Sequence, residues 1–489
     1  MLFNSIDFAV FLPIVFLLYW FVFNKNLRIQ NLFLVIASYI FYGWWDWTFL
    51  LLMGFTTICS WYSGILIELV RKKKKQIRKR SRIIVASNII VNLLILGFFK
   101  YYNFFLISFI DAFKIFGKEL NISTLKLILP VGISFYTFQA LSYTIDVYRD
   151  NLKPTKDVIS FFAFVSFFPQ LVAGPIERAT NLLPQFQKHK VFDYAKGIDG
   201  CRQILWGLFK KIVIADNSAI IVNEVFGNSG NMTGSALAIG AVFFAFQIYG
   251  DFSGYSDIAI GTARLFGINL MRNFNYPYFS RDIAEFWRKW HISLTTWFRD
   301  YIYIPLGGSR VVKWKVIRNT FVIFLVSGFW HGANWTFVFW GLFHALLFLP
   351  LIVFGKNRKH VDIIASNRIF PNIVEFSQIF FTFILVCLGW IFFRAETIAH
   401  AFEYIGGITS MSLFSIPSFG MVSRIKVLIV FVFISIMLLL EWFGRSDQFA
   451  IEKIGLKWNR PLRLSFYYVL IMLIIWESGP EQQFIYFQF

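Results

Sequence analysis

The sequence is poor in cysteine and in charged residues. Its three cysteines stand far apart and form neither a CxxC pair nor a Cys/His ligand pattern, so neither a disulfide framework nor a metal site is predicted. The chain also lacks a GxxxxGK[ST] or GxGxxG loop, which argues against a nucleotide-hydrolysing pump and a dinucleotide-dependent enzyme. Only 15% of the 489 residues are charged, too few to cover a soluble protein of this length.

Apolar and aromatic residues are abundant instead. Hydrophobic residues make up 57% of the chain and aromatic residues 20%, a composition typical of membrane proteins. The net charge of +20 is explained by Lys and Arg in cytoplasmic loops, which set orientation and contact membrane lipids, and no nucleic-acid partner is predicted. The run RKKKKQIRKRSR at residues 71–82 is the clearest case. A specific phosphate ligand remains the alternative for this run.

About eleven transmembrane helices are expected, because apolar segments long enough to cross a bilayer follow one another along the chain. They occupy residues 6–23, 31–45, 48–70, 83–99, 204–225, 236–266, 321–334, 336–354, 376–392, 427–442 and 464–476. The first lacks the basic region and cleavage site of a signal peptide and is read as a retained span. Basic patches two spans apart place both termini outside the cytosol. The expected fold is an all-α polytopic membrane protein with one domain over residues 1–489.

Prolines and glycines break the apolar pattern between residues 127 and 175. Non-helical backbone at membrane depth must be covered by protein or line a cavity, so re-entrant pieces are expected there. An ordinary kink in a spanning helix remains the alternative for Pro130. Further on, Gly250 and Gly254 are four residues apart, a spacing that lets two helices approach closely.

Charged residues interrupt two of the later segments. Lys210 and Lys211 are read as the inner end of the fifth span. The sixth segment is longer than one crossing and contains Asp251 and Asp257. An acidic group near a membrane cavity usually has a partner or a task, so both aspartates are candidate substrate-binding residues.

The stretch from residue 276 to 344 is the most informative part of the chain. Its first half mixes charges with aromatic residues at every turn, as a helix lying in the membrane interface does. Its second half is apolar but carries His331, 13 residues after Arg318, or about 20 Å along a helix. An ionisable residue at that depth is a functional-site hypothesis. On physical grounds a general base and a structural histidine are equally good readings of it.

Several segments of the chain closely resemble the membrane-bound O-acyltransferases, in particular the bacterial branch that acts in alginate and peptidoglycan O-acetylation. They read LPVGISFYTFQALSYTIDVYR, FFPQLVAGPIER, QIYGDFSGYSDIAIG, EFWRKWHISLTTWFRDYIYIPLGG and SGFWHGANWTFVFWG. The resemblance implies interfacial and re-entrant helices around a central tunnel. It places the family's catalytic histidine at His331, framed by Trp330 and Asn334, and gives His291 a supporting role at the donor end. His344 is read as structural.

The resemblance further implies acyl transfer from acetyl-coenzyme A, a substrate rather than a bound cofactor, to an exported polysaccharide. Arg288, Lys289 and Arg299 are the candidate contacts to the phosphates of the coenzyme. The partner expected is a periplasmic or extracellular acetyltransferase of the SGNH type, and the location a bacterial inner membrane. A transporter or flippase for lipid-linked saccharides is the alternative, because broken helices and intramembrane acids also suit it.

The C-terminus ends in EQQFIYFQF, an apolar tail where solvated residues are usual. Residues 480–489 are therefore expected to be buried. The tail resembles the F-x-Y-F-x-F ending associated with cell-envelope acyltransferases, which implies that Tyr486 carries the acyl group. Tyr486 is accordingly the third candidate catalytic residue, beside His331 and His291.

Overall fold

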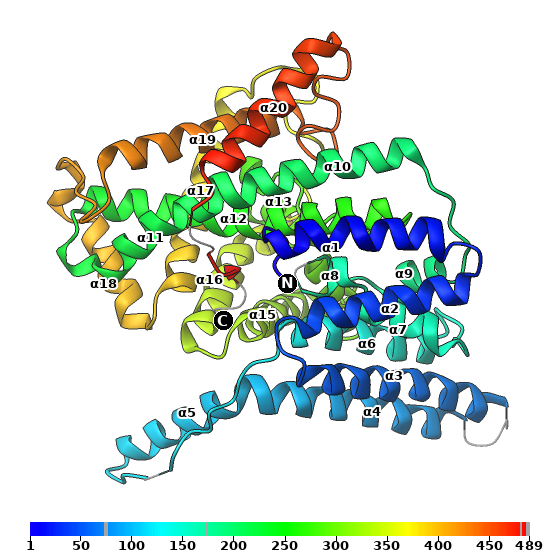
Figure 1. Ribbon diagram of the computed structural model, residues 1–489. Helices are drawn as coiled ribbons and strands as arrows, with labels where there is room; N and C mark the ends of the chain where they lie inside the picture. Colours follow the sequence, from blue (N-terminus) through cyan, green and yellow to red (C-terminus); the bar gives the residue numbers. More distant parts are fainter. Residues whose placement is uncertain (73–76, 121, 173, 480–481, 486–489) are drawn as a thin grey trace. The chain divides into compact units, whose positions relative to one another are not determined.

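The computed structural model describes residues 1–72, 77–120, 122–172, 174–479 and 482–485, and these residues form helices joined by loops, with no strand among them (Figure 1). The chain divides into two compact units, Met1–Ile198 with Thr262–Met271, and Asp199–Gly261 with Arg272–Phe489. The all-α class predicted from the sequence is confirmed for the described residues.

The first unit consists of helices from the N-terminal part of the chain. They are α1 (Ile6–Leu17), the π-helical segment η1 (Leu18–Val22), α2 (Leu27–Gly43), α3 (Phe49–Lys72), α4 (Ile77–Leu96), the π-helical η2 (Gly97–Tyr101), α5 (Tyr102–Ile115), α6 (Ile133–Tyr148), α7 (Val158–Ser166), α8 (Phe168–Leu171) and α9 (Ala179–Phe186). The expected break in the pattern is present: Gly132 takes a left-handed φ of 71°, and the chain then enters α6.

The second unit carries the stretch that the sequence singled out. Its elements are α10 (Tyr194–Leu208), which begins in the first unit, η3 (Phe209–Asp216, π-helical), α11 (Asn217–Gly227), η4 (Ser229–Asn231), α12 (Gly234–Leu265), which ends in the first unit, η5 (Pro277–Phe279), α13 (Ile283–Lys289), α14 (Ile292–Phe298), η6 (Arg299–Tyr303, π-helical), α15 (Lys313–His331), α16 (Trp335–Val353), α17 (Ile373–Arg394), α18 (Ile398–Ile408), η7 (Met411–Phe414), α19 (Arg424–Phe443) and α20 (Arg460–Trp476).

Each of the eleven segments predicted to span a membrane falls on a helix or a run of helices. Six helical stretches of the described chain are long and apolar enough to cross a bilayer: Phe49–Lys72, Arg78–Ile115, Gly234–Leu265, Trp335–Val353, Ile373–Arg394 and Arg424–Phe443. In the third of these, α12, 78% of the most apolar window is buried by protein, against 22–44% in the others. Helix α12 is therefore an interior helix around which the second unit packs.

Glycines bring α12 against the preceding helical run. A Cβ atom at Gly254 would lie 2.8 Å from the carbonyl oxygen of Gly207, and one at Gly250 would lie 3.0 Å from that of Lys210. No side chain fits at such distances, so the two backbones touch. The close packing predicted from the Gly250 and Gly254 spacing is confirmed.

Candidate active site

Helices α15 and α16 form a tight hairpin that holds His331 at its turn. A Cβ atom at Gly328 would lie 2.2 Å from the carbonyl oxygen of Phe337, and one at Gly341 would lie 2.3 Å from that of Phe324. Only glycine allows this approach. His331 is the last residue of α15, which is helical throughout as the apolar run predicted, so the hairpin fixes the position of the imidazole.

The turn itself is closed by Asn334. Its side-chain oxygen accepts a hydrogen bond from the backbone N–H of Thr336 at 3.1 Å and so caps α16. Its amide nitrogen donates to the carbonyl oxygen of Glu396 at 3.0 Å, which ties the turn to the end of α17. Asn334, predicted to frame His331, thus sets the geometry of the turn.

Aromatic rings surround the imidazole of His331, which is only 3% exposed. Ring centroids of Trp330, Trp340 and Phe393 lie 5.0, 5.2 and 5.4 Å from it. The centroid of the His291 ring lies 6.4 Å away, and Trp330 packs against both histidines. The structure therefore brings the two predicted histidines together behind an aromatic wall that limits access of water.

His291 is buried, although its charged sequence neighbours suggested an interfacial position. It is 1% exposed and takes a left-handed conformation, with φ 44°, between α13 and α14. Such a conformation is uncommon outside glycine and turns the chain sharply. The sharp turn directs the ring inward, so the imidazole is buried in protein although its sequence neighbours are charged.

The charges around His291 are neutralised by one another. Glu285 in α13 accepts from Arg281 at 3.0 Å and from Lys289 at 2.8 Å. Burial of Glu285 favours its protonated form, but the hydrogen bonds and charges of Arg281 and Lys289 outweigh burial and lower its pKa below the ordinary value. The predicted interfacial helix is instead a pair of short helices whose charges pair internally, and this pairing allows them to be buried.

Asn273 selects the tautomer of His291. Its Oδ1 lies 3.1 Å from Nδ1 of His291 and also accepts from Oγ of Ser293 at 2.8 Å, while its Nδ2 donates to Oγ of Ser256 at 3.1 Å. Because an amide oxygen only accepts, Nδ1 of His291 must carry the proton. Nε2 then holds a lone pair.

The imidazole of His291 is held in its neutral form. Burial lowers its pKa to about 3, because a charged ring would lose its hydration. At any pH near neutrality His291 therefore acts as a neutral group that can accept a proton or a hydrogen bond at Nε2.

The three predicted phosphate-contact residues already have partners in the structure. Arg288 donates to the carbonyl oxygen of Asn357 at 2.8 Å, Lys289 pairs with Glu285, and Arg299 pairs with Asp300 at 2.7 Å. They do not converge on one another. An anion would have to exchange with these partners to bind here.

His344 has the structural role expected of it. Its ring is fully buried, and its Nδ1 accepts a hydrogen bond from Nε1 of Trp287 at 3.3 Å. A Cβ atom added at Gly389 would lie 2.8 Å from Nε2 of the same ring, so α17 packs directly on it. His344 joins α13, α16 and α17.

Lys210 and Lys211 do not form the inner end of a span, as the sequence suggested. They are buried on η3 and face α12, where Lys210 pairs with Asp257 at 2.6 Å and Lys211 pairs with Asp251 at 2.9 Å. Each aspartate offsets the desolvation cost of burying its lysine, and each lysine offsets that of its aspartate. A small cavity lined by Lys210 and Asp257 also reaches Asn273, so this network lies directly behind the support of His291.

Two of the four described residues of the C-terminal tail are buried, as predicted, whereas Gln483 is exposed. Phe484 and Ile485 are 0% and 1% exposed, and the ring of Phe484 packs on Phe252 at a centroid distance of 5.9 Å. Phe252 in turn packs on the ring of His291 at 4.6 Å. The described part of the tail is therefore separated from His291 by one aromatic ring, that of Phe252. Tyr486 lies outside the described residues.

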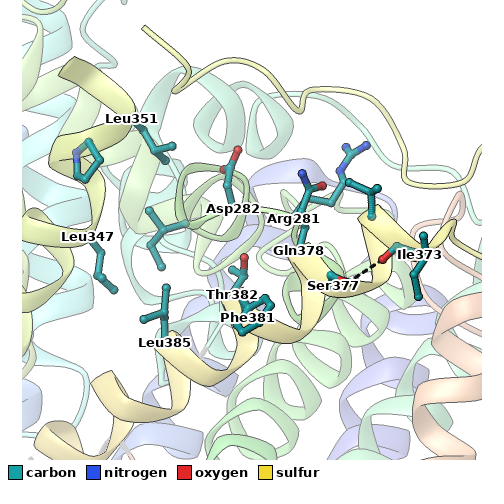
Figure 2. Close-up of a pocket in the computed structure, with 13 residues that line it drawn as sticks. Arg281, Asp282, Leu347, Leu351, Ile373, Ser377, Gln378, Phe381, Thr382 and Leu385 are labelled. Carbon is teal, nitrogen blue, oxygen red and sulfur yellow. Dashed lines mark hydrogen bonds between the residues drawn. The ribbon is translucent and has the colours of Figure 1, made fainter. Parts of the chain in front are cut away.

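An open pocket of about 480 Å³ lies elsewhere in the second unit, between α13, α16 and α17 (Figure 2). Aliphatic and aromatic side chains line most of it, among them Leu347, Phe381 and Leu385, with Arg281 and Asp282 at one end. Neither His291 nor His331 lines it. Its apolar wall between two membrane-spanning helices suits a lipid chain better than a reacting polar group.

Two functional residues were missed by reasoning from the sequence. Asn273 is one polar residue among several in a loop, and no spacing links it to His291. Lys211 was assigned to the wrong environment because buried and cytosolic lysines look alike in a sequence. The aspartates at 251 and 257 were the available signal, since buried acids require cationic partners.

Comparison with known proteins shows the family to which the chain belongs. The model of the MBOAT, membrane-bound O-acyltransferase family, matches residues 32–392. Similar proteins include a probable alginate O-acetylase AlgI of Pseudomonas putida, 36% identical over 507 residues, with 100% of each chain covered. A peptidoglycan O-acetyltransferase of Helicobacter pylori is 35% identical over 441 residues, covering 84% of this chain and 80% of that protein.

A more distant relative is a teichoic acid D-alanyltransferase of Bacillus subtilis, 31% identical over 291 residues, covering 56% of this chain and 71% of that protein. The family match includes α12, both candidate histidines and the α15–α16 hairpin. With its apolar helices, the chain is a multi-pass membrane protein. It belongs to the membrane-bound O-acyltransferase family.

Proposed function

We propose that this protein transfers an acetyl group from cytosolic acetyl-coenzyme A towards an exported polysaccharide, with His331 as general base. The observation that carries this proposal is the buried pair of His331 and His291, 6.4 Å apart between ring centroids. Two buried imidazoles behind an aromatic wall suit proton transfer during acyl transfer, in which water would be a competing nucleophile.

The proposed reaction needs no metal ion. The imidazole of His331 takes the proton of an attacking hydroxyl, the hydroxyl oxygen bonds to the thioester carbon, and the carbon–sulfur bond breaks. The thiolate of coenzyme A leaves and accepts the proton from the imidazolium. The products are an ester and the free thiol, and the base is restored. His291, with a lone pair at Nε2, assists at the donor end.

The proposed first acceptor is the phenol of Tyr486. Its tail approaches the histidines from the side of Phe252, and the phenol is easier to deprotonate than a sugar hydroxyl. The resulting aryl ester is then activated for transfer to a glycan hydroxyl. A periplasmic or extracellular transferase of the SGNH type would collect it. Residues 480–489 would thus serve as an acyl carrier attached to a single membrane domain.

Acetyl is favoured over D-alanyl as the transferred group. The relatives named for O-acetylation match 84% and 100% of this chain, whereas the D-alanyltransferase matches 56%. Either an alginate-like polymer or peptidoglycan would then be the final acceptor. Arg288, Lys289 and Arg299 are proposed to contact the phosphates of coenzyme A, each by exchanging its present partner.

In the proposed topology the chain lies in a bacterial inner membrane with both termini outside the cytosol. The six long apolar helices are supplemented by shorter ones, so that an even number of crossings close to the eleven predicted segments, together with the buried short helices, surrounds a central tunnel. Asp257 and Trp330 would line this path near the histidines.

The proposal is tested by incubating the purified protein in lipid nanodiscs with labelled acetyl-coenzyme A and measuring released thiol and protein-bound label. A transporter or flippase would release none. His331→Ala is expected to lower the rate about 10² to 10⁴-fold, the usual contribution of a general base. His291→Ala should lower it less.

The matched control is His189→Ala, which removes an exposed imidazole whose Nε2 lies 2.8 Å from the backbone carbonyl oxygen of Asn24. It should retain the wild-type rate. A His331→Ala protein that folds and remains active would exclude His331 as base. An active protein whose tail never carries label at Tyr486 would exclude the carrier step but leave the acyltransferase assignment intact.

A further inference from the structure

The described tail residues are held by their main chain. The carbonyl oxygen of Gln482 accepts a hydrogen bond from Nζ of Lys211 at 3.2 Å, and the backbone N–H of Ile485 donates to Oδ2 of Asp251 at 2.6 Å. The side chain of Phe484 lies between these contacts, with its ring 4.5 Å from that of Tyr255. Lys211 and Asp251 thus bind the first and last residues of the four-residue segment 482–485.

The two gripping residues are themselves paired and buried. Lys211 and Asp251 are 2.9 Å apart, with side chains 1% and 4% exposed. Lys211 also donates to Asp216 at 2.6 Å and to the Gln482 carbonyl at 3.2 Å, so its ammonium group is surrounded by two carboxylates and one carbonyl oxygen. Two carboxylates on one lysine leave an excess of negative charge, which favours an additional N–H donor at Asp251. The backbone of Ile485 supplies it.

We propose that Lys211 and Asp251 form a clasp for the main chain of the C-terminal tail, and that this clasp determines how far the tail reaches towards the histidine pair. Neither residue takes part in the acyl-transfer step, so both are positioning residues. The positioning role of the clasp rests on the proposed carrier function of the tail. Binding of the tail by the clasp can nevertheless be measured without any substrate.

The clasp has a defined chemical preference. Because both contacts go to backbone atoms, these two hydrogen bonds do not depend on the identity of the side chains at 482 and 485, whereas the N–H of residue 485 cannot be lost. Phe484 adds affinity by burying its ring against Tyr255 and Phe252. The site therefore recognises a short peptide segment with one buried aromatic side chain.

Docking is tested by hydrogen exchange of the C-terminal peptide, measured by mass spectrometry on the full-length protein in nanodiscs without donor. Asp251→Ala and Ile485→Pro should each increase exchange of the tail about 10- to 100-fold, since each removes a charge-assisted hydrogen bond. Ile485→Pro lies in the tail, so it tests the contact even if Asp251→Ala disturbs packing. Equal protection in both variants and the wild type would overturn the clasp.

The chain offers a matched control in the neighbouring lysine. Lys210 is similarly buried, but its ammonium group contacts Asp257, Ser253 and the ring of Tyr249 rather than the described residues of the tail. Lys211→Met should release the tail, Lys211→Arg should retain most protection, and Lys210→Met should leave tail exchange as in the wild type. If Lys210→Met releases the tail as strongly as Lys211→Met, general loosening and not a clasp explains the effect.

Kinetics then separate the clasp from the carrier function. In Lys211→Met the KM for acetyl-coenzyme A should remain unchanged while kcat falls at least about tenfold, because the donor binds elsewhere and only the acceptor is displaced. A protected wild-type tail in a protein that transfers no acetyl group would leave the clasp standing and remove the proposed function. Transfer that proceeds normally with a released tail would overturn the positioning role.

Discussion

Replacing Asn273 by Asp should give the enzyme a new dependence on pH. The two side chains have nearly the same shape, so Oδ1 still accepts from His291 and Ser293, and the Ser256 hydroxyl can rotate to donate to the other oxygen. Only the charge changes. A carboxylate 3.1 Å from Nδ1 stabilises the protonated imidazole, whereas the wild-type amide leaves the pKa of His291 lowered by burial to about 3.

The size of the effect follows from these contacts. A neighbouring opposite charge raises the pKa of a histidine by about one to three units, so His291 in the variant should titrate between about 4 and 6. Protonation fills the lone pair at Nε2. Activity should therefore be close to wild type at pH 8 and fall on the acid side, by up to about tenfold at pH 5 if the pKa reaches 6.

The assay is the rate of thiol release from acetyl-coenzyme A between pH 4.5 and 9, for wild type and variant in the same nanodiscs. Asn275→Asp is the control, because it introduces a carboxyl group two residues away. The backbone N–H of residue 275 donates to the carbonyl oxygen of Lys289 and not to His291. If the Asn273→Asp profile coincides with that of the wild type, the tautomer and neutral state assigned to His291 are refuted.

Three further predictions concern stability and topology. Because the pKa of His291 in the folded protein lies below its ordinary value, the unfolded chain binds more protons between pH 3 and 6.5, and the free energy of unfolding should fall as the pH is lowered. At pH 5, His291→Gln should raise the free energy of unfolding by about 2 kcal/mol, measured by thermal or denaturant unfolding. Gly254→Ala should cost about 1 to 3 kcal/mol through overpacking, whereas Gly227→Ala, with open space around it, should be neutral in the same unfolding experiment. In a chain freed of its native cysteines, a cysteine at Arg82 should react with impermeant reagents only from the cytosol, and one at Asn4 only from outside; labelling of both from one side would contradict the expected topology.

Much of the helical framework could be predicted because long apolar runs leave few alternatives in a membrane. The continuous helix to His331 and the close packing of Gly254 followed from spacing alone. The burial of His291 could not be predicted, because it depends on a left-handed turn and on charge pairing within α13 that composition does not show. Lys211 was misplaced for a related reason: its partner Asp251 lies 40 positions along the chain, and only the fold brings these two residues together.

In the π-helical segment η3, the directions in which the side chains point depend on the presence of every residue in the turn. In an α-helix two consecutive lysines would point about 100° apart around the axis. Over Phe209–Asp216 the turns are wider, and Lys210 and Lys211 both reach α12. Deleting one residue here would favour an ordinary α-helix, which is the more stable local form, but would rotate everything on one side of the deletion and aim Lys211 away from Asp251. The π-helical turn is therefore locally less stable than an α-helix, but it points the side chain of Lys211 at Asp251. A one-residue deletion, too small to change the hydropathy of the segment, would be enough to break the contact between Lys211 and the tail.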